Sequence, residues 1–446
     1  MKEIIVRILT GFIPRKKWRK AFRNTFLREK IVVSEINTDV ETVIDEDPPV
    51  SLLQNYENTV KRLHLKIKRG ERIRVCFSVI YDSTFVADTI FEKMQKDPMF
   101  EPFILVVPDI LRGEDNMFYQ MNKTYKSLSE KYLNVHIAYD YNTKEFLDWA
   151  NKMDICFFAN PYDCMTHRLY SIEYCAESGI LCVFTEYGYV ISNWHYTLYN
   201  NIEFKSLWKI LALEKFEYEE LLKNLQDKKM VLLTGYCKMD ALANHKEHPR
   251  TRKKIIIAPH HTIENEGFTL SNFEKYADFF LELPEQYPEI DFVFRPHPLL
   301  FVKLREENLW GKQKTDEYIN KMKSFPNVEY QDGGEYFETF VNSDGMIHDC
   351  GSFSAEYLFT NHPCCFLLKD DATTLKNSNE FHRACIDNHY KAYDKDDIIK
   401  FIEDVIIKKQ DLMKKKRKVF FNKFIKNNYP NTSRKIIKYI KKELKK

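Results

Sequence analysis

The chain has 446 residues, of which 44% are hydrophobic and 14% aromatic, and its formal net charge at pH 7 is +3. This composition is typical of a soluble globular protein, and the length suffices for two domains of ordinary size, each with its own core. The ten cysteines form no C-x-x-C pair and no metal-ligand spacing, and no cleavable signal pattern is present. We therefore expect reduced, mostly buried thiols in a cytoplasmic protein, without a zinc site or another cofactor.

Positive charge is concentrated at the two ends of the chain. Residues 1–30 carry ten Lys or Arg against two Glu, and residues 408–446 carry sixteen against one Asp and one Glu, so that the body between them is acidic. Such segregation predicts an anionic partner for the ends, either membrane lipid or nucleic acid. The basic run from Lys414 to Lys418 is the segment that we expect to contact this partner.

Residues 1–50 combine a basic amphipathic start with an acidic linker. Apolar residues share one helical face in the first twelve positions and basic residues follow Pro14, which is the pattern of a short interfacial helix or of a terminal helix packed on the protein's own body. The acidic stretch 34–50 ends near Pro48 and Pro49, which predicts a linker. At the other end, residues 401–446 are expected to form basic helices whose apolar face packs partly on the protein.

The body of the chain alternates short apolar runs with helical patterns, which favours parallel sheets with crossover helices. We expect a first α/β domain over residues 51–225 and a second over residues 226–400. No G-x-G-x-x-G or G-x-x-x-x-G-K-[ST] loop is present, so classical dinucleotide and P-loop chemistry is disfavoured. Strands are expected at residues 72–81, 103–108, 135–139, 154–159 and 180–185 and near residues 231, 255, 291, 328, 346 and 364, with helices at 271–283 and 352–360.

Residues 344–358, D-G-M-I-H-D-C-G-S-F-S-A-E-Y-L, predict a strand, a turn of small residues and a new helix. Gly351 and Ser352 allow the backbone to approach a ligand closely, and a helix that begins there presents unpaired N–H groups. Glu356 would lie above Ser352 on such a helix and could reach a ribose. The plain alternative is an ordinary turn with Ser352 as the helix cap.

Residues 290–298, I-D-F-V-F-R-P-H-P, predict a strand that ends at two phosphate-binding side chains. Arg295 offers a guanidinium group for phosphate, and His297 can donate a hydrogen bond to a phosphate oxygen. The flanking prolines stiffen the loop. Together with the helix start after Asp349, these residues favour an anion site at the carboxyl ends of the strands.

Two further motifs precede them, T-G-Y-C-K-M-D from Thr234 and A-P-H-H, which contains His260 and His261. The order of these motifs, followed by R-P-H-P, D-C-G-S-F-S-A-E-Y-L and N-H-P-C-C-F, resembles the CDP-glycerol glycerophosphotransferase family, which builds teichoic-acid-like and capsular polymers in bacteria. The resemblance covers about residues 230–370. It implies a GT-B fold, in which two Rossmann-like α/β domains face a cleft and the second domain holds most of the nucleotide.

The resemblance also implies roles for individual residues. The diphosphate would be bound by Arg295, Ser352 and the backbone near Gly351 and Phe353, while Glu356 would hold the ribose. His297 would contact the leaving group, with a second contact from His260 or His261. The donor-binding set is thus Arg295, Asp349, Gly351, Ser352, Phe353 and Glu356, and the catalytic set is His297, His260, His261 and Glu186.

The chain departs from the family pattern at two places. Gly351 and Ser352 stand where better-known members have two serines, and V-F-T-E-Y-G-Y at 183–189 stands in the region of a W-H-G-T motif whose His is the proposed base. In this stretch Glu186 is the candidate base, and His195 nearby is the other. No D-x-D motif stands at a strand end of the first domain, so we expect no metal.

The function implied is the transfer of an alcohol phosphate from a CDP-linked donor, CDP-glycerol or a related CDP-alcohol, to a lipid-linked or polymer acceptor. The enzyme would work at the inner face of the cell membrane, on an anionic membrane surface. The same scaffold would also suit a GT-B glycosyltransferase that uses a nucleotide sugar. A nucleic-acid-binding protein is a further alternative, but no binding motif or aromatic platform accompanies the basic ends, and we expect no nucleic-acid partner.

Overall fold

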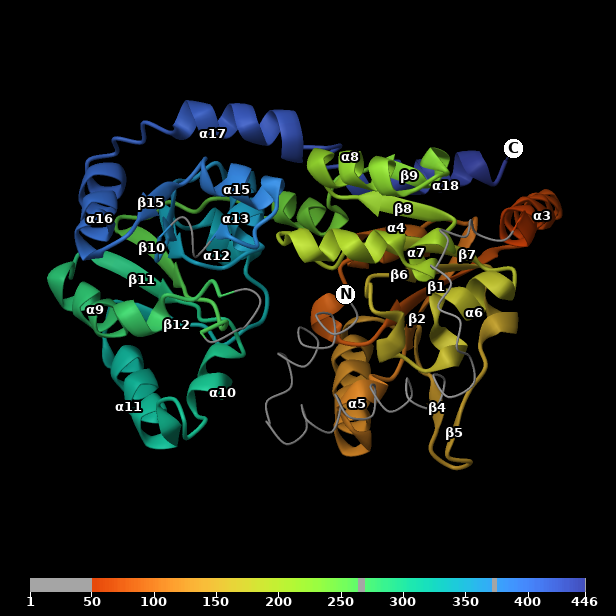
Figure 1. Ribbon diagram of the computed structural model, residues 1–446, viewed down its shortest axis with the longest axis horizontal. Helices are drawn as coiled ribbons and strands as arrows, with labels where there is room; N and C mark the ends of the chain where they lie inside the picture. Colours follow the sequence, from red (N-terminus) through yellow and green to blue (C-terminus); the bar gives the residue numbers. More distant parts are fainter. Residues whose placement is uncertain (1–49, 264–268, 371–374, 446) are drawn as a thin grey trace, which may run out of the picture. The chain divides into compact units, whose positions relative to one another are not determined.

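The computed structural model describes residues 50–263, 269–370 and 375–445 (Figure 1). Contacts between residues divide the chain into two compact units. Of the described residues, the seven-stranded unit contains 50–188, 194–240 and 427–445, and the six-stranded unit contains 189–193 and the rest of 241–426. Each unit therefore draws on stretches that are far apart in the sequence.

The seven-stranded unit is built on a parallel sheet with the order β3-β2-β1-β6-β7-β8-β9. Its central strands are short apolar runs that are buried along their whole length, as expected where helices cover both faces of a parallel sheet. Its strands are β1 (Ile73–Val79), β2 (Phe100–Val106), β3 (Val135–Ile137), β6 (Ile155–Phe158), β7 (Leu181–Thr185), β8 (Lys209–Ala212) and β9 (Val231–Leu233), and a small antiparallel pair joins β4 (Tyr139–Asp140) to β5 (Glu145–Phe146).

Helices connect these strands, and the last helix of the chain returns to the same unit. Helix α18 (Thr432–Glu443) begins where the backbone N–H groups of Thr432 and Ser433 donate to the carboxylate of Asp240, at 3.0 and 2.8 Å. Ile436, Ile437 and Ile440 bury one face of α18 in the core. The other α-helices are α3 (Val50–Lys68), α4 (Asp88–Gln95), α5 (Glu114–Lys131), α6 (Ile172–Glu177), α7 (Ile202–Lys205) and α8 (Lys215–Asn224), and the longest 3-10 segments are η6 (Asn193–Asn200) and η8 (Cys237–Asn244).

The six-stranded unit has a second parallel sheet, with the order β12-β11-β10-β13-β14-β15. Its strands are β10 (Lys253–Ala258), β11 (Ile290–Phe294), β12 (Val328–Tyr330), β13 (Gly345–His348), β14 (Cys364–Leu367) and β15 (Tyr390–Ala392). Its helices are α9 (Phe273–Gln286), α10 (Leu300–Leu304), α11 (Gly311–Ser324), α12 (Phe337–Val341), α13 (Phe353–Glu356), the 3-10 turn η9 (Tyr357–Thr360), α15 (Glu380–Ile386), α16 (Lys395–Lys400), the π-helical segment η10 (Phe401–Ile407), α17 (Lys414–Phe420) and the π-helical segment η11 (Phe421–Ile425).

In both sheets the strand order reverses beside the first strand of the unit. The reversal lies between β1 and β6 in one sheet and between β10 and β13 in the other. In open parallel sheets, ligands bind outside the carboxyl ends of the strands at such a switch point. The fold therefore directs attention to the residues that follow these strands.

Most of the predicted elements are found, but one strand belongs elsewhere. The strand near residue 231, expected to open the second domain, is β9, which pairs with β8 at the edge of the seven-stranded sheet. A three-residue apolar strand carries no local sign of its partner, so its sheet is decided by tertiary packing. The helix predicted at 352–360 is a four-residue α-helix, α13, continued by the 3-10 turn η9.

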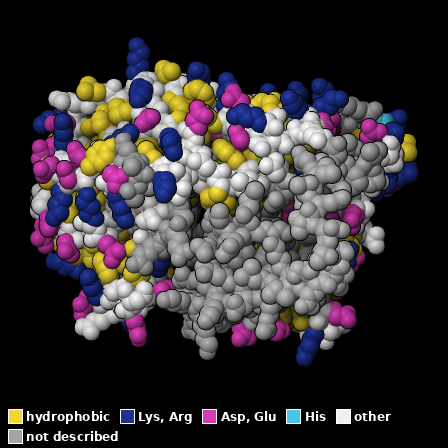
Figure 2. All heavy atoms as spheres, in the orientation of Figure 1, with side chains coloured by type: hydrophobic (Ala, Val, Ile, Leu, Met, Phe, Trp, Pro, Cys, Tyr) yellow, Lys and Arg dark blue, Asp and Glu magenta, His cyan; other side chains and the backbone are white. Residues whose placement is uncertain are grey.

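The basic C-terminal segment forms the predicted helices, whereas the basic start at residues 1–30 lies outside the described residues. Along the edge that α17 occupies in Figure 1, Lys or Arg and hydrophobic side chains lie together on the surface (Figure 2). Arg417, however, is buried, where it pairs with Asp411 and donates to the carbonyl oxygen of Asn361 at 2.9 Å. Within the described part of the chain, every helix is too short or too polar to cross a membrane.

Candidate functional site

Three neighbouring strands of the six-stranded sheet end at the residues that the motifs singled out. His260 and His261 follow β10, Arg295 and His297 follow β11, and Asp349 follows β13. Because β10 pairs in parallel with both β11 and β13, these carboxyl ends lie side by side at the switch point. The structure therefore brings the predicted residues of this unit to one edge of one sheet.

Asp349 joins two of these loops from a fully buried position. One carboxylate oxygen accepts a hydrogen bond from the backbone N–H of His260 at 2.6 Å, and the other accepts from the N–H of Asn272 at 2.5 Å. Burial raises the pKa of Asp349 to about 7, although these N–H donors oppose the shift. Asp349 thus shapes the edge of the site, and its direct contact with a donor remains a prediction.

The three histidines of A-P-H-H and R-P-H-P form a compact cluster. The ring centroids of His261 and His297 are 4.0 Å apart. The ring centroid of His260 lies 4.4 Å from that of His261 and 5.1 Å from that of His297. Burial lowers the pKa of His297 to about 4 and that of His261 to about 2, the latter also because of His297 and Lys303, and it lowers the pKa of His260 well below its usual value. All three rings are therefore neutral at pH 7.

Hydrogen bonds to the backbone define which ring nitrogens carry the protons. The N–H of Leu299 donates to Nδ1 of His297 at 3.2 Å, and Nδ1 of His260 lies 2.9 Å from Oγ1 of Thr262 and 3.4 Å from the N–H of Thr262. A neutral imidazole whose Nδ1 accepts a hydrogen bond carries its proton on Nε2. His297 consequently offers an Nε2–H donor, and His260 offers one when its Nδ1 accepts from Thr262; such donors suit phosphate oxygens.

Arg295 differs from the expectation of a guanidinium open to ligand. Its side chain is buried, and it donates to Oε1 of Gln331 at 2.8 Å and to the backbone carbonyl oxygen of Gly334. The guanidinium also lies 5.3 Å from the ring centroid of Tyr336. In the structure Arg295 therefore holds the loop 331–336, and a contact with phosphate would require these bonds to be exchanged.

The turn after β13 is tightly packed. A Cβ atom on Gly351 would lie 2.1 Å from Cδ1 of Ile191, so this glycine allows the strap 189–193 to approach the turn. The strap is held by hydrogen bonds from the N–H of Asn379 to the carbonyl oxygen of Ile191, at 3.0 Å, and from the N–H of Asn193 to that of Asn377, at 3.1 Å. The small residue thus serves a contact within the protein that its motif did not predict.

The remaining predicted donor residues have partners of their own. Ser352 stands at the N-cap position of α13, as the alternative predicted, but it is in helical conformation and its side chain makes no capping hydrogen bond. The ring of Phe353 packs 5.1 Å from that of Tyr336, whose hydroxyl donates to Oε2 of Glu356. Glu356 is buried, so any ribose contact would compete with Tyr336 for this carboxylate.

The candidate base lies in the seven-stranded unit, directly after β7. Oε1 of Glu186 is 2.8 Å from Nε2 of His195, and both side chains are buried. The sequence offered these two residues as alternatives, whereas the structure makes them a hydrogen-bonded pair. Eight residues of intervening chain, including the strap, hide this pairing from any local pattern.

A second polar group in this unit was missed by the sequence. Asp109 follows β2 and accepts hydrogen bonds from the hydroxyl of Tyr81, which follows β1, and from Arg112 at 2.7 Å. Arg112 also donates to the Tyr81 hydroxyl. Burial raises the pKa of Tyr81, so the phenol stays protonated. The only available signal was the position of Asp109 after a predicted strand.

Among the described residues, two groups bring three possible metal ligands within 4.8 Å of one another. One is the histidine cluster, and the other is His348, Cys364 and His389, all of them buried. Nδ1 of His348 accepts a hydrogen bond from the N–H of Cys350 at 3.2 Å, which again leaves the proton on Nε2. Burial also raises the pKa of Cys364 well above its usual value, which disfavours the thiolate that a metal would require in this second group.

No protein-family model and no curated protein matches the sequence. Solved structures do match in fold. The wall teichoic acid polymerase TagF superimposes with a TM-score of 0.57 at 14% identity, over 95% of this chain and 98% of that one. A putative UDP-N-acetylglucosamine 2-epimerase from Listeria monocytogenes gives 0.55 at 14% identity, over 83% and 96% of the two chains. The 2-epimerase from Neisseria meningitidis bound to UDP-GlcNAc gives 0.54 at 14% identity, over 83% and 100%.

These matches agree with the two sheets of the structure. At such low identity they establish the fold and not the reaction, and the proteins named in them are enzymes. The resemblance inferred from the motifs is confirmed at the level of fold, because TagF belongs to the glycerophosphotransferases. The chain thus has an α/β fold of the GT-B class, with two Rossmann-like units, similar to the fold of the teichoic acid polymerase TagF.

Proposed function

We propose that the protein is a transferase that moves an alcohol phosphate from a CDP-linked donor, such as CDP-glycerol, to a hydroxyl of a lipid-linked or polymer acceptor. The product would be a bacterial cell-surface polymer such as teichoic acid or capsule. The observation that carries the proposal is the cluster of His260, His261 and His297 at the switch point of the six-stranded sheet. The fold shared with TagF supports the same assignment.

The six-stranded unit would bind the donor diphosphate through neutral N–H donors. Nε2–H groups of His260 and His297 can donate to phosphate oxygens and strengthen as negative charge develops on the leaving group. Their lowered pKa values mean that binding costs no change of protonation at neutral pH. Asp349 would support these donors by holding the loop of His260, and Arg295 would tie the loop of His297, to which it belongs, to the loop 331–336.

The transfer itself is a displacement at phosphorus. The oxygen of the acceptor hydroxyl forms a bond to the phosphorus distal to cytidine, the bond from that phosphorus to the bridging oxygen breaks, and CMP leaves. The hydroxyl proton goes to a base, and we assign this role to His195. With Nε2–H of His195 donating to Glu186, Nδ1 retains a lone pair that can accept the proton, and Glu186 orients the ring.

A second candidate function is the conversion of a nucleotide sugar. Solved neighbours of similar fold include epimerases that act on UDP-N-acetylglucosamine, one of them with this nucleotide sugar bound. Nε2–H donors at a strand edge would bind the diphosphate of either kind of donor. The two functions differ in the bond that breaks, and therefore in the nucleotide that is released.

A donor panel separates the candidates. The purified protein is incubated with CDP-glycerol, other CDP-alcohols and UDP-GlcNAc, and released nucleotide is measured by chromatography with and without membranes as a source of acceptor. We expect CMP from CDP-glycerol, and its loss in His297→Gln but not in His248→Gln, whose side chain is exposed and pairs with Glu338. Release of UDP, or epimerised UDP-sugar, with no CMP would favour the second candidate.

We further propose that α17 attaches the protein to an anionic membrane surface. Lys414, Lys415 and Lys418 are exposed there, beside Leu412 and Val419, which are 89% and 59% exposed. Exposed aliphatic side chains among lysines favour the interface of an anionic bilayer. Because Arg417 is buried, it cannot take part in this contact.

A further inference from the structure

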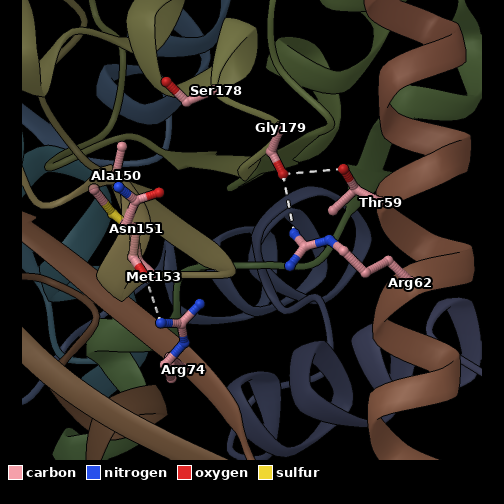
Figure 3. A pocket seen from close by; sticks show the side chains of 8 residues that line it. All are labelled: Thr59, Arg62, Arg74, Ala150, Asn151, Met153, Ser178 and Gly179. Carbon is pink, nitrogen blue, oxygen red and sulfur yellow. Dashed lines mark hydrogen bonds between the residues drawn. The ribbon is translucent and has the colours of Figure 1, made fainter.

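The seven-stranded unit contains a cavity at the edge of its sheet that lies opposite Glu186. Its volume is about 200 Å³, and it lies where the strands begin, before β1, β6 and β7. In Figure 3, Thr59 and Arg62 extend from α3 toward the backbone carbonyl oxygen of Gly179, and Arg74 lies on the β1 side. The lining residues are Thr59, Arg62, Arg74, Ala150, Asn151, Met153, Ser178 and Gly179.

One carboxylate in this region, that of Asp154, is already fully satisfied. Arg74 donates to both of its oxygens, at 2.9 and 3.1 Å, and Lys66 donates to Oδ2 at 2.7 Å. Burial alone would raise the pKa of Asp154, but these hydrogen bonds lower it to about 2. Asp154 is therefore ionised, and two cations already neutralise it.

Arg62 is the third cation near Asp154, and its hydrogen bonds are the longest. Its guanidinium reaches Asp154 and the carbonyl oxygen of Gly179 only at 3.4 Å, near the limit of a hydrogen bond, and its side chain is 53% exposed. Glu101 is a second carboxylate that interacts with Arg74. Two of the three cations, Arg62 and Arg74, line the polar cavity, and Arg62 is the more weakly bound of the two.

We propose that this cavity binds the phosphate group of a small phosphorylated molecule. Arg62 would supply two N–H donors in the fork geometry that matches a phosphate, and the volume suits one phosphate with a few attached atoms. Arg74 would contribute its charge while it remains bound to Asp154. The cavity lies at the amino ends of the strands, so this site is separate from the proposed base and does not depend on the proposed function.

Calorimetry with inorganic phosphate as the probe, at constant ionic strength maintained with chloride, tests the site on the full-length protein. Arg62→Gln removes the charge of the surplus cation with little effect on folding, because its contacts are long. We expect phosphate binding to weaken by roughly 10- to 100-fold. Arg69→Gln is the matched control, since Arg69 follows the same helix and pairs with Glu71 outside the cavity.

The titration is repeated in a His297→Gln background. This substitution weakens phosphate binding at the histidine cluster, so that binding there does not mask the effect of Arg62→Gln. Dependence on Arg62 should persist in that background, and circular dichroism should show both arginine variants folded. Equal phosphate affinity in wild type and Arg62→Gln would overturn the proposal. An equal loss in Arg69→Gln would also overturn it, because it would reveal attraction to the general charge of the surface.

Discussion

The two units bury titratable groups of opposite kinds. In the six-stranded unit, burial lowers the pKa values of His260, His261, His297, His348, His382 and His389. In the seven-stranded unit, burial raises the pKa values of Asp88 to about 6, Asp163 to about 7 and Glu214 to about 8. Buried histidines therefore predominate in the six-stranded unit and buried carboxyl groups in the seven-stranded unit, with Asp349 and His195 among the exceptions.

This difference corresponds to two chemical tasks. Neutral imidazoles donate to an anion without a compensating change of protonation, which suits the binding of a diphosphate. A buried carboxylate beside an imidazole, as in Glu186 and His195, orients the ring, which suits proton removal. Two sheets of similar topology thus differ in the residues that follow the strands, and the predictions below test this division.

The largest effect is expected at the proposed base. His195→Gln should lower kcat by about 10²- to 10⁴-fold, because a positioned base is lost from the transfer step. Glu186→Gln should give a smaller loss, since the ring keeps a neutral partner. Measured by calorimetry, CDP binding should stay unchanged in both variants. A matching loss of nucleotide affinity would show instead that the pair contributes to donor binding.

The reverse pattern is expected for the histidine cluster. His297→Gln should weaken CDP binding by roughly 10- to 100-fold, because one hydrogen bond to a charged phosphate is removed. His248→Gln serves as the control on an exposed histidine of the same unit. If His297→Gln binds CDP as tightly as the wild type, the six-stranded unit does not hold the diphosphate through this ring.

Attachment to the membrane is expected to depend on the six-stranded unit, through α17. Glu in place of Lys414, Lys415 and Lys418 removes up to roughly 1 kcal/mol of attraction to anionic lipid for each lysine that reaches the surface. Co-sedimentation with anionic vesicles should fall about tenfold or more. The control replaces Lys435, Lys438 and Lys442 on α18, which are exposed in the other unit. Equal release by both triple variants would show that no single surface makes the contact.

The smallest effect is a divergence of the two units with pH. Histidines with lowered folded pKa values bind more protons when unfolded, so the stability that they contribute is present above about pH 6.5 and is lost as the pH falls below it. Carboxyl groups with raised folded pKa values act in the opposite sense, because they bind more protons in the folded state. The stability that they contribute therefore increases as the pH falls from 8 toward 4. Asp349, whose pKa is raised to about 7, opposes the histidines within its own unit.

Between pH 7.5 and pH 5, we therefore expect the six-stranded unit to lose stability relative to the seven-stranded unit by a few degrees in Tm. Hydrogen-exchange mass spectrometry at both pH values, corrected for intrinsic exchange rates, can follow peptides from β10 and β11 against peptides from β6 and β7. Parallel behaviour of the two sets would contradict the comparison.

Some features followed from local sequence. Runs such as Ile155–Phe158 and Ile290–Phe294 are apolar throughout, so they could be recognised as buried strands of parallel sheets. Because carboxyl ends of neighbouring parallel strands share an edge, the positions of His260, His297 and Asp349 after strands also predicted their grouping. The order of the motifs gave the fold class.

Other features depended on contacts between distant residues. The sheet to which β9 belongs, the pairing of Glu186 with His195, the burial of Arg417 and the engagement of Arg295 with the loop 331–336 could not be read from the chain. A hydrophobic or charge pattern records which residue types prefer water. It does not record which partner a buried polar group finds, and only the tertiary structure decides that partner.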